Sequence, residues 1–404
     1  MPLDSTPTTS DADAFDVIVV GGGPAGATAA RDLAAAGRRV LLLDKQGRIK
    51  PCGGAIPPRL IRDFDIPDHM LCARIRSARM IAPSRNAVDM PVENGFVGMV
   101  DRDRFDEFLR ERAQGAGAER RAGTFVAWAR DASGASIVTY RDKASDTLAQ
   151  VRCRVVIGAD GANSAVAREA APNIKRPPFV FAYHEIVRTP QRNADTTFPT
   201  RCDVYYQGDV SPDFYGWVFP HGETMSIGVG SAEKGFSLRD ATARLRAQAG
   251  LSGCETVRRE GAPLPLYPAK RWDNGHDVIL AGDAAGVVAP ASGEGIYYAM
   301  ATGRLCAEAA DEFLRTGDVR ALASARKRFM KEHGRVFFIL WVMQTFWYRN
   351  DKRREKFVAL CRDPDIQRLT WESYMNKKLV RRDPLAHVRV FFKDLGQILG
   401  LART

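Results

Sequence analysis

The sequence predicts a mixed α/β (α+β) fold, in which a parallel-sheet domain carries an inserted antiparallel sheet and is followed by a C-terminal helical segment. Two observations predict it. A strand, a glycine-rich loop and a helix open the chain, and two more strands that end in Gly-Asp or Ala-Asp turns follow far downstream. With 404 residues, 45% of them apolar, the chain is long enough for two or three structural units.

The first element is a β-branched strand over residues 15–20, followed by a helix over residues 25–36 that stops at Gly37. A glycine loop connects them, which is the context of a Rossmann-like dinucleotide site. Gly21 allows a tight turn, Gly23 lets the backbone approach a pyrophosphate, and Gly26 allows close helix packing. The predicted contact residues of this loop are Gly21, Gly23, Ala25 and Gly26.

The second strand, residues 39–43, leads directly to Asp44. A carboxylate at this distance from the glycine loop accepts hydrogen bonds from an adenosine ribose. The sequence therefore predicts Asp44 as a second cofactor contact.

Two later strands end in turns of the same kind. Residues 155–157 lead to Asp160, and residues 277–281 lead to Asp283. A long helix then starts at the segment Gly293-Glu294-Gly295-Ile296, where backbone amides are available to a bound group. These three glycine-rich turns in this order indicate a flavin nucleotide.

Residues 15–320 resemble the large flavoprotein group built like aromatic hydroxylases. The resemblance implies that Asp160 positions the dinucleotide, that Asp283 bonds the ribityl chain, and that an arginine at a helix start contacts the cofactor. Arg102 is preferred to Arg104 for that role. The amides of Gly293, Gly295 and Ile296 would face the flavin pyrimidine. FAD is the implied cofactor, with NADPH as a transient reductant that has no domain of its own.

Three further stretches narrow the group: residues 51–58 (PCGGAIPP), 212–220 (PDFYGWVFP) and 292–297 (SGEGIY). They are similar to signatures of geranylgeranyl reductases, those of the chlorophyll and bacteriochlorophyll pathway in particular. This resemblance implies an FAD-dependent oxidoreductase that saturates three double bonds of a geranylgeranyl chain to phytyl. The substrate would be geranylgeranyl diphosphate or the geranylgeranyl ester of the pigment.

The predicted catalytic residues are Cys52, Tyr215 and Trp217. Reduction of an isolated alkene needs a proton as well as a hydride, and positive charge develops at the tertiary carbon. Aromatic faces stabilise such charge, and Tyr215 and Trp217 alternate along a predicted strand, so both point to one side. Cys52, in a glycine-rich loop, is a proton donor or a wall of the prenyl slot. The alternatives are a core stripe for the aromatics and a small buried side chain for Cys52.

Two other functions share the predicted frame. One is an oxygen-using flavin hydroxylase or halogenase, although no halogenase-type lysine is found near the glycine loop. The other is a non-catalytic prenyl-binding escort protein, a class that has lost the complete glycine fingerprint present here.

The remaining signals concern partners. Seven cysteines without metal-ligand spacing predict free thiols, a reducing cytoplasm and no metal. Of the net charge of +11, the last 70 residues carry 15 Lys and Arg against 7 Asp and Glu. Because aromatics run through 337–348, this basic segment predicts a peripheral contact with anionic membrane rather than nucleic acid. No stretch is long enough to span a bilayer. The oligomeric state is left open.

The predicted division has three parts after a disordered tail over residues 1–14, which lacks signal-peptide character. The FAD-binding domain comprises residues 15–60, 95–170 and 265–330. The substrate sheet comprises 61–94 and 171–264. Residues 331–404 form a C-terminal helical cap, for which a membrane-facing side is an expectation.

Overall fold

The computed structural model describes residues 14–47, 49–93, 95–190 and 201–377, so the predicted tail and the last part of the predicted cap lie outside the described residues. The chain forms two compact units, which are described separately. The first unit takes residues up to 49, 103–179 and 263–334, and the second takes 50–102, 180–262 and 335 onward. Residues 50–60 and 95–102 thus group with the second unit, because they pair with strands of that unit.

The first unit is built on a sheet in which five strands run parallel, in the order β8-β2-β1-β10-β16. A sixth strand, β9, pairs antiparallel with β8 and with the start of β10. The central strands are buried on both faces, as the unbroken apolar runs 17–20 and 40–43 predict. The strands are β1 (Ala14–Val20), β2 (Val40–Asp44), β8 (Glu119–Arg130), β9 (Ser136–Asp142), β10 (Leu148–Gly158) and β16 (Val278–Leu280).

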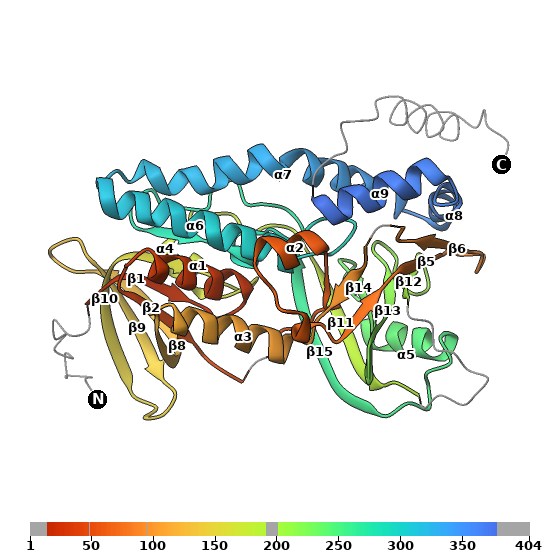
Figure 1. Ribbon diagram of the computed structural model, residues 1–404, viewed down its shortest axis with the longest axis horizontal. Coiled ribbons are helices and arrows are strands. Elements are labelled where there is room, and N and C mark those ends of the chain that lie inside the picture. The colour runs from red at the N-terminus through yellow and green to blue at the C-terminus, as the bar shows by residue number, and fades with distance from the viewer. Residues whose placement is uncertain (1–13, 48, 94, 191–200, 378–404) are drawn as a thin grey trace. The chain divides into compact units, whose positions relative to one another are not determined.

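Helix α1 lies against helix α6 in this unit (Figure 1), and a glycine makes their close approach possible. A Cβ on Gly303 of α6 would lie 2.2 Å from the carbonyl oxygen of Ala25 in α1. The unit's helices are α1 (Pro24–Ala35), α3 (Arg102–Gly115), α4 (Ala165–Ala170), the short η3 (Gly282–Ala285), α6 (Ile296–Thr316) and the first part of α7 (Arg320–Trp347).

The second unit is built on a seven-stranded sheet in the order β15-β11-β14-β13-β12-β5-β6. Neighbours along β11-β14-β13-β12 are antiparallel, whereas β12 and β5 are parallel. Its strands are β5 (Ser77–Ile81), β6 (Ala87–Pro91), β11 (Phe179–Arg188), β12 (Cys202–Tyr205), β13 (Gly216–His221), β14 (Thr224–Ser231) and β15 (Thr256–Pro265). A small antiparallel sheet joins β3 (Ala55–Ile56), β7 (Val97–Met99) and β4 (Ala73–Ile75).

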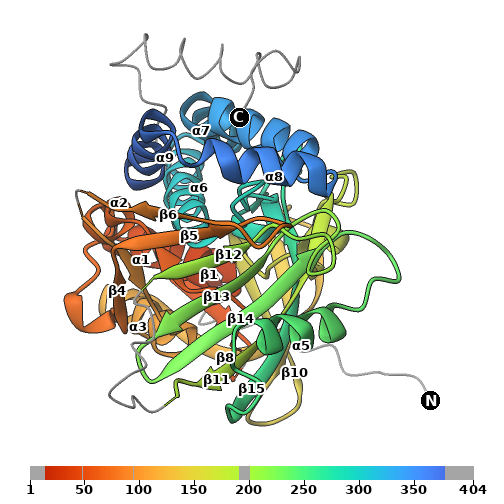
Figure 2. The same cartoon turned by 90° about the vertical axis from the view of Figure 1, so that its right-hand side faces the viewer.

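Helix α5 (Leu238–Gln248) covers one face of the larger sheet, as Figure 2 shows. Val218, Ile227 and Val229 pack with Leu245 in the core under it. Because side chains alternate along a strand, Trp217 and Phe219 of β13 lie on the opposite face. The remaining helices of this unit are α2 (Pro58–Asp63), the short η2 (Asp68–Met70), the end of α7, α8 (Asp351–Leu360) and α9 (Pro364–Asn376).

Candidate functional site

The turns after β1, β2, β10 and β16 all lie at the carboxyl edge of the parallel sheet, because these four strands run in one direction. This edge is where ligands bind in open parallel sheets. It carries the predicted residues Gly21, Gly23, Ala25, Gly26, Asp44, Asp160 and Asp283.

The glycines of this loop differ in the space that a Cβ atom would have. Gly21 has φ +105°, and a Cβ there would lie 2.4 Å from the carbonyl oxygen of Ala159. A Cβ on Gly26 would lie 1.9 Å from the carbonyl oxygen of Gly21. A Cβ on Gly23, by contrast, would meet nothing within 4 Å. The fold itself therefore requires glycine at 21 and 26, whereas at 23 it leaves open space beside the backbone.

The first turn of α1 is open to an anion. Gly23 is its N-cap residue, no side chain caps the helix, and Pro24 follows as the first helical residue. Unpaired backbone N–H groups and the helix dipole favour negative charge at such an end. Together with the space at Gly23, this arrangement fits a dinucleotide pyrophosphate.

Asp44 is held beside this loop. Its carboxylate accepts a hydrogen bond from the backbone N–H of Gly22 (3.2 Å) and lies 3.5 Å from Nη1 of Arg110, which also donates to the Gly22 carbonyl. Arg110 in turn bonds Glu107, whose pKa is lowered by its hydrogen bond to Arg120, against the opposing effect of burial. The sequence did not predict a role for Arg110. The one local signal was its spacing of three residues from Glu107 on α3, which is typical of an ion pair on a helix.

Asp160 has a structural role in the described contacts. Its carboxylate accepts hydrogen bonds from the Ser164 hydroxyl (2.5 Å) and from the N–H groups of Ala165 (2.6 Å) and Val166 (3.1 Å). Burial raises its pKa, and these hydrogen bonds oppose that effect. Asp160 thus fixes the start of α4 at the edge of the predicted cofactor site, and its contact with the dinucleotide stays a prediction.

The structure brings Asp283 together with the start of α6. Asp283 is only 6% exposed, and a Cβ on Gly295 would lie 3.9 Å from its carboxylate oxygen. Gly295 is the N-cap of α6, which begins at Ile296 without a side-chain cap. Gly293, two residues earlier, has φ +64°, a backbone conformation that glycine adopts without strain because it has no Cβ atom. These four predicted residues form one local group.

The second unit holds Cys52, Tyr215, Trp217 and Arg102. The Cys52 loop lies on the aromatic face of β13, because a Cβ on Gly53 would be 3.1 Å from the Phe219 ring and 3.9 Å from Nε1 of Trp217. Two signatures about 160 positions apart in the sequence therefore meet within one unit. The backbone N–H of Gly54 donates to the Cys52 sulfur at 3.3 Å.

An aromatic row runs along β13 on this face. Ring centroids are 6.2 Å apart for Tyr215 and Trp217, and 6.4 Å apart for Trp217 and Phe219. Phe214 stacks on Tyr215 at 4.3 Å. The opposite face of the strand is packed at this point, since a Cβ on Gly216 would meet Val210 and Leu245.

A buried hydrogen-bond network holds Trp217. Its Nε1 donates to the Ser226 hydroxyl oxygen (3.0 Å), Ser226 bonds Nδ1 of His184 (3.0 Å), and Nε2 of His184 bonds Glu260 (2.9 Å). Because Glu260 accepts, Nε2 carries a proton, and in the neutral ring Nδ1 accepts from Ser226. Glu260 is 76 residues from His184, so no local pattern in the sequence indicates this pairing.

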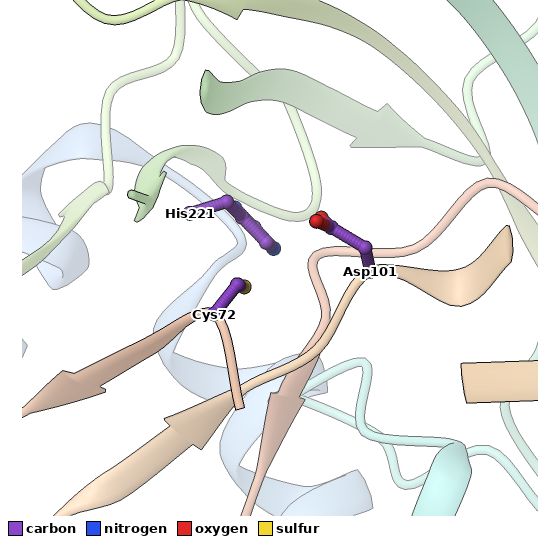
Figure 3. Close-up of side chains that lie close together, drawn as sticks. All are labelled: Cys72, Asp101 and His221. Carbon is purple, nitrogen blue, oxygen red and sulfur yellow. The ribbon is translucent and has the colours of Figure 1, made fainter. Parts of the chain in front are cut away.

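Three further side chains meet near the Cys52 loop: Cys72, Asp101 and His221 (Figure 3). One donor atom from each lies within 4.8 Å of the others. Burial lowers the pKa of His221, and the negative charge of Asp101 opposes that shift. Arg102, the predicted cofactor arginine, follows Asp101 at the start of α3 and is buried.

Helix α7 carries exposed apolar side chains in its second half. Phe338 is 56% exposed and Trp341 is 44% exposed, and Ile339 and Val342 are each 40% exposed. The neighbouring aromatics Phe337, Trp347 and Tyr348 are buried. Arg354, one of the basic residues of the segment predicted to contact membrane, is buried and bonds Asp351 and the carbonyl oxygens of Pro212 and Tyr348. Within the described part of the chain, no helix is both long and apolar enough to cross a membrane.

The family described as FAD binding domain matches residues 14–328. The chain is 60% identical to the geranylgeranyl diphosphate reductase of Rhodobacter capsulatus, over 96% of this chain and 98% of that protein. It is 35% identical to the geranylgeranyl diphosphate reductase of Synechocystis, over 95% of this chain and 97% of that protein.

Solved structures agree on the fold. A geranylgeranyl bacteriochlorophyll reductase-like protein from Thermoplasma acidophilum superposes with a TM-score of 0.80 at 23% identity, covering 96% of this chain and 99% of that one. A flavin-dependent brominase superposes with a TM-score of 0.74 at 18% identity, covering 94% and 99%. At these identities the likeness shows the mixed α/β flavoprotein architecture and no particular reaction.

Proposed function

The chain belongs to the FAD-dependent geranylgeranyl reductases, and from that premise we propose that it reduces three of the four double bonds of a geranylgeranyl chain to give phytyl. The acceptor is geranylgeranyl diphosphate or the geranylgeranyl ester of bacteriochlorophyll, and NADPH is the electron donor. The observation that supports the proposal is the placement of the Cys52 loop on the aromatic row of β13 within one unit.

The residues of the first unit fit FAD. The pyrophosphate has space at Gly23 and an uncapped helix end at α1, the ribose has Asp44, and the ribityl chain has Asp283. When bound and reduced, the flavin supplies the hydride. Arg102 is proposed as a further contact, and the amides at Gly293, Gly295 and Ile296 as partners of the pyrimidine ring.

The second unit supplies what an unactivated alkene needs. Tyr215, Trp217 and Phe219 give an apolar wall on which a prenyl chain packs, and their ring faces stabilise positive charge at the tertiary carbon. Cys52 is proposed to deliver the proton to the less substituted carbon, so that each double bond gains one hydride and one proton. Cys52 is half-buried, and its loop packs against this wall at Gly53.

The reaction can be tested by anaerobic incubation of the purified protein with NADPH and each acceptor, followed by mass analysis of the prenyl chain. We expect products that are heavier by two, four and six hydrogens in succession. A product that gains oxygen in air would contradict the reductase and favour a hydroxylase. Protein that purifies without flavin and cannot bind FAD would favour the non-catalytic escort function.

The role of Cys52 is tested with Cys52→Ala. We expect slower alkene reduction, while FAD content and NADPH-driven flavin reduction remain near those of the unaltered protein. Cys254→Ala is the matched control, because Cys254 is also half-buried in the second unit but packs against the core under α5. Undiminished alkene reduction by Cys52→Ala would remove the thiol from the mechanism.

We also propose that the exposed face of α7 binds anionic membrane peripherally. Phe338, Trp341 and Val342 follow the i, i+3, i+4 spacing that puts them on one side of a helix. Lys352 is exposed shortly after them, and Lys356 is partly exposed. An apolar helix face with nearby basic residues is typical of interfacial binding, and the proposed substrates are lipids.

A further inference from the structure

We propose that Cys72, Asp101 and His221 form a binding site for a thiophilic divalent cation, Zn²⁺ in particular. The three residues come from separate segments of the second unit. Cys72 immediately precedes β4, Asp101 lies between β7 and α3, and His221 ends β13. The site uses none of the residues proposed to act in the reduction.

The donor atoms have the right kind and spacing. A thiol sulfur, a carboxylate oxygen and a ring nitrogen all lie within 4.8 Å of one another, and Figure 3 shows the three side chains pointing toward a common centre. Zinc bonds of about 2.0–2.3 Å in a tetrahedron place neighbouring ligand atoms about 3.3–3.6 Å apart. Small side-chain rotations therefore close the group around an ion.

The orientation of His221 suits a metal ligand. Its Nδ1 lies 3.1 Å from the carbonyl oxygen of Phe219, and because a carbonyl only accepts, Nδ1 carries the proton. Nε2 then presents its lone pair. A ligating histidine usually donates its other N–H to a carbonyl or carboxylate in this way, which fixes the ring.

Two hydrogen bonds also fix the position of Cys72. Its backbone N–H and its thiol both donate to the carbonyl oxygen of Met99, at 2.9 and 3.2 Å. On binding, Zn²⁺ takes the place of the thiol proton, so one proton is released and a zinc–thiolate bond forms. The thiolate and the Asp101 carboxylate then offset both charges of the ion, which a half-buried site requires.

The ligand set also selects among cations. A thiolate favours zinc over the oxygen-preferring Mg²⁺ and Ca²⁺. The part of the chain that the structure describes offers three ligands in this group, so a water molecule completes four.

The site would stabilise the Cys52 loop. Gly54 has φ +72°, and a Cβ on it would lie 2.4 Å from Nε2 of His221 and 2.5 Å from the carbonyl oxygen of Val100. The loop thus packs directly against the ligand nitrogen. An ion that fixes His221 and Asp101 therefore fixes the floor on which this loop lies.

The test uses full-length, FAD-loaded protein that has been stripped of metal with a chelator, equilibrated with one equivalent of ZnCl₂ and desalted. We expect one zinc per chain by elemental analysis. Zinc K-edge X-ray absorption should show one sulfur at about 2.3 Å and nitrogen or oxygen ligands at about 2.0–2.2 Å. Absence of retained zinc, or a zinc spectrum without sulfur, would overturn the proposal.

Variants locate the ion. Cys72→Ser and His221→Gln should each weaken zinc binding more than about tenfold in a chelator competition. Cys254→Ser and His69→Gln are the matched controls, one half-buried and one exposed, and should retain it. Equal zinc affinity in all four variants would place the metal elsewhere. If the first two fail to fold, Asp101→Asn and the absorption spectrum of the unaltered protein decide.

Discussion

Gly23 and Gly26 are three residues apart, yet the surroundings of their Cα atoms differ completely. A side chain at 26 would collide with the backbone of Gly21, whereas a side chain at 23 would enter open space. Gly23 also has extended backbone, with φ −74° and ψ −177°, which any residue adopts. A substitution at each position therefore separates the fold from the cofactor.

We expect Gly23→Val to fold normally but to lose FAD, with at least a tenfold weaker Kd, or about 1.4 kcal/mol. Gly26→Ala should instead destabilise the apoprotein itself. Flavin absorbance after desalting and thermal unfolding of the apoproteins measure the two effects. Full FAD occupancy in Gly23→Val would show that the pyrophosphate does not approach this residue.

The hydrogen bond from Trp217 to Ser226 gives a second prediction at this scale. Ser226→Ala leaves a buried indole N–H without its partner, at a cost of about 1–3 kcal/mol. Because Trp217 then loses its fixed orientation, alkene reduction should also slow. Ser136→Ala is the matched control, since Ser136 is equally buried and likewise accepts from an indole N–H, that of Trp128 in the first unit.

Both serine variants should unfold at lower temperature, but only Ser226→Ala should change the turnover of a prenyl substrate relative to flavin reduction. Equal effects on turnover would mean that the network stabilises the sheet without serving the aromatic row.

Residue identity predicted the parts of the site that depend on local backbone. The glycine loop, Asp44 and the segment from Gly293 to Ile296 follow from neighbouring residues and from strand order. Local sequence does not predict Arg110, the pairing of His184 with Glu260, or the group at His221. Their contacts join segments that are tens of residues or more apart in the sequence. Pairing of distant segments leaves no spacing signal in one sequence.

At the scale of elements, helix α7 divides the aromatics of the predicted run between a buried and an exposed side. The sequence indicated one aromatic run over 337–348, but the helix places Phe337 and Trp347 in the interior and Phe338 and Trp341 outside. Hydrophobicity alone does not distinguish these two sets, because the packing partners of the helix decide which side is covered.

The double substitution Phe338→Ser and Trp341→Ser should reduce sedimentation with anionic liposomes severalfold and leave FAD content unchanged. High salt should release part of the unaltered protein, since screening weakens attraction by basic residues. Val126→Ser, a change at an exposed apolar residue of β8, is the control and should bind normally. Equal binding to neutral and anionic vesicles would contradict the electrostatic part.

Strand β16 is anchored at its beginning by Asp277. Arg130 donates to both carboxylate oxygens, at 2.6 and 3.0 Å, and Ser136 donates at 2.9 Å. Burial alone would raise the pKa of Asp277, but the bonds from Arg130, Asn274 and Ser136 outweigh it and lower the pKa. The group therefore contributes stability above its unfolded pKa of about 3.9, and the contribution is lost as pH falls through the lower folded value.

Asp277→Asn should thus lower the thermal midpoint at pH 7 and make its decline below about pH 4 shallower than in the unaltered protein. Unfolding midpoints between pH 3 and 7 measure this difference. Parallel curves for the two proteins would mean that Asp277 titrates alike in the folded and unfolded states.

At the scale of the whole molecule, the sequence predicted the class of fold, because strand-to-turn signals survive even when a domain is interrupted. The sequence gives no direct signal for the residues at which the chain passes from one unit to the other. Residues 50–60 and 95–102 carry short strands whose partners are each other and residues 73–75, and only the pairing of β3, β4 and β7 assigns them.

Each unit draws on three separate stretches, and the last stretch of each comes from beyond residue 262. During synthesis at the ribosome, β1 and β10 therefore emerge long before β16 and α6, which complete their sheet and cover α1. Nascent chains that have not yet reached α6 would expose apolar strands that lack partners, a state prone to aggregation. We therefore expect the first unit to fold only after α6 has left the ribosome, so that its early strands stay without partners until then.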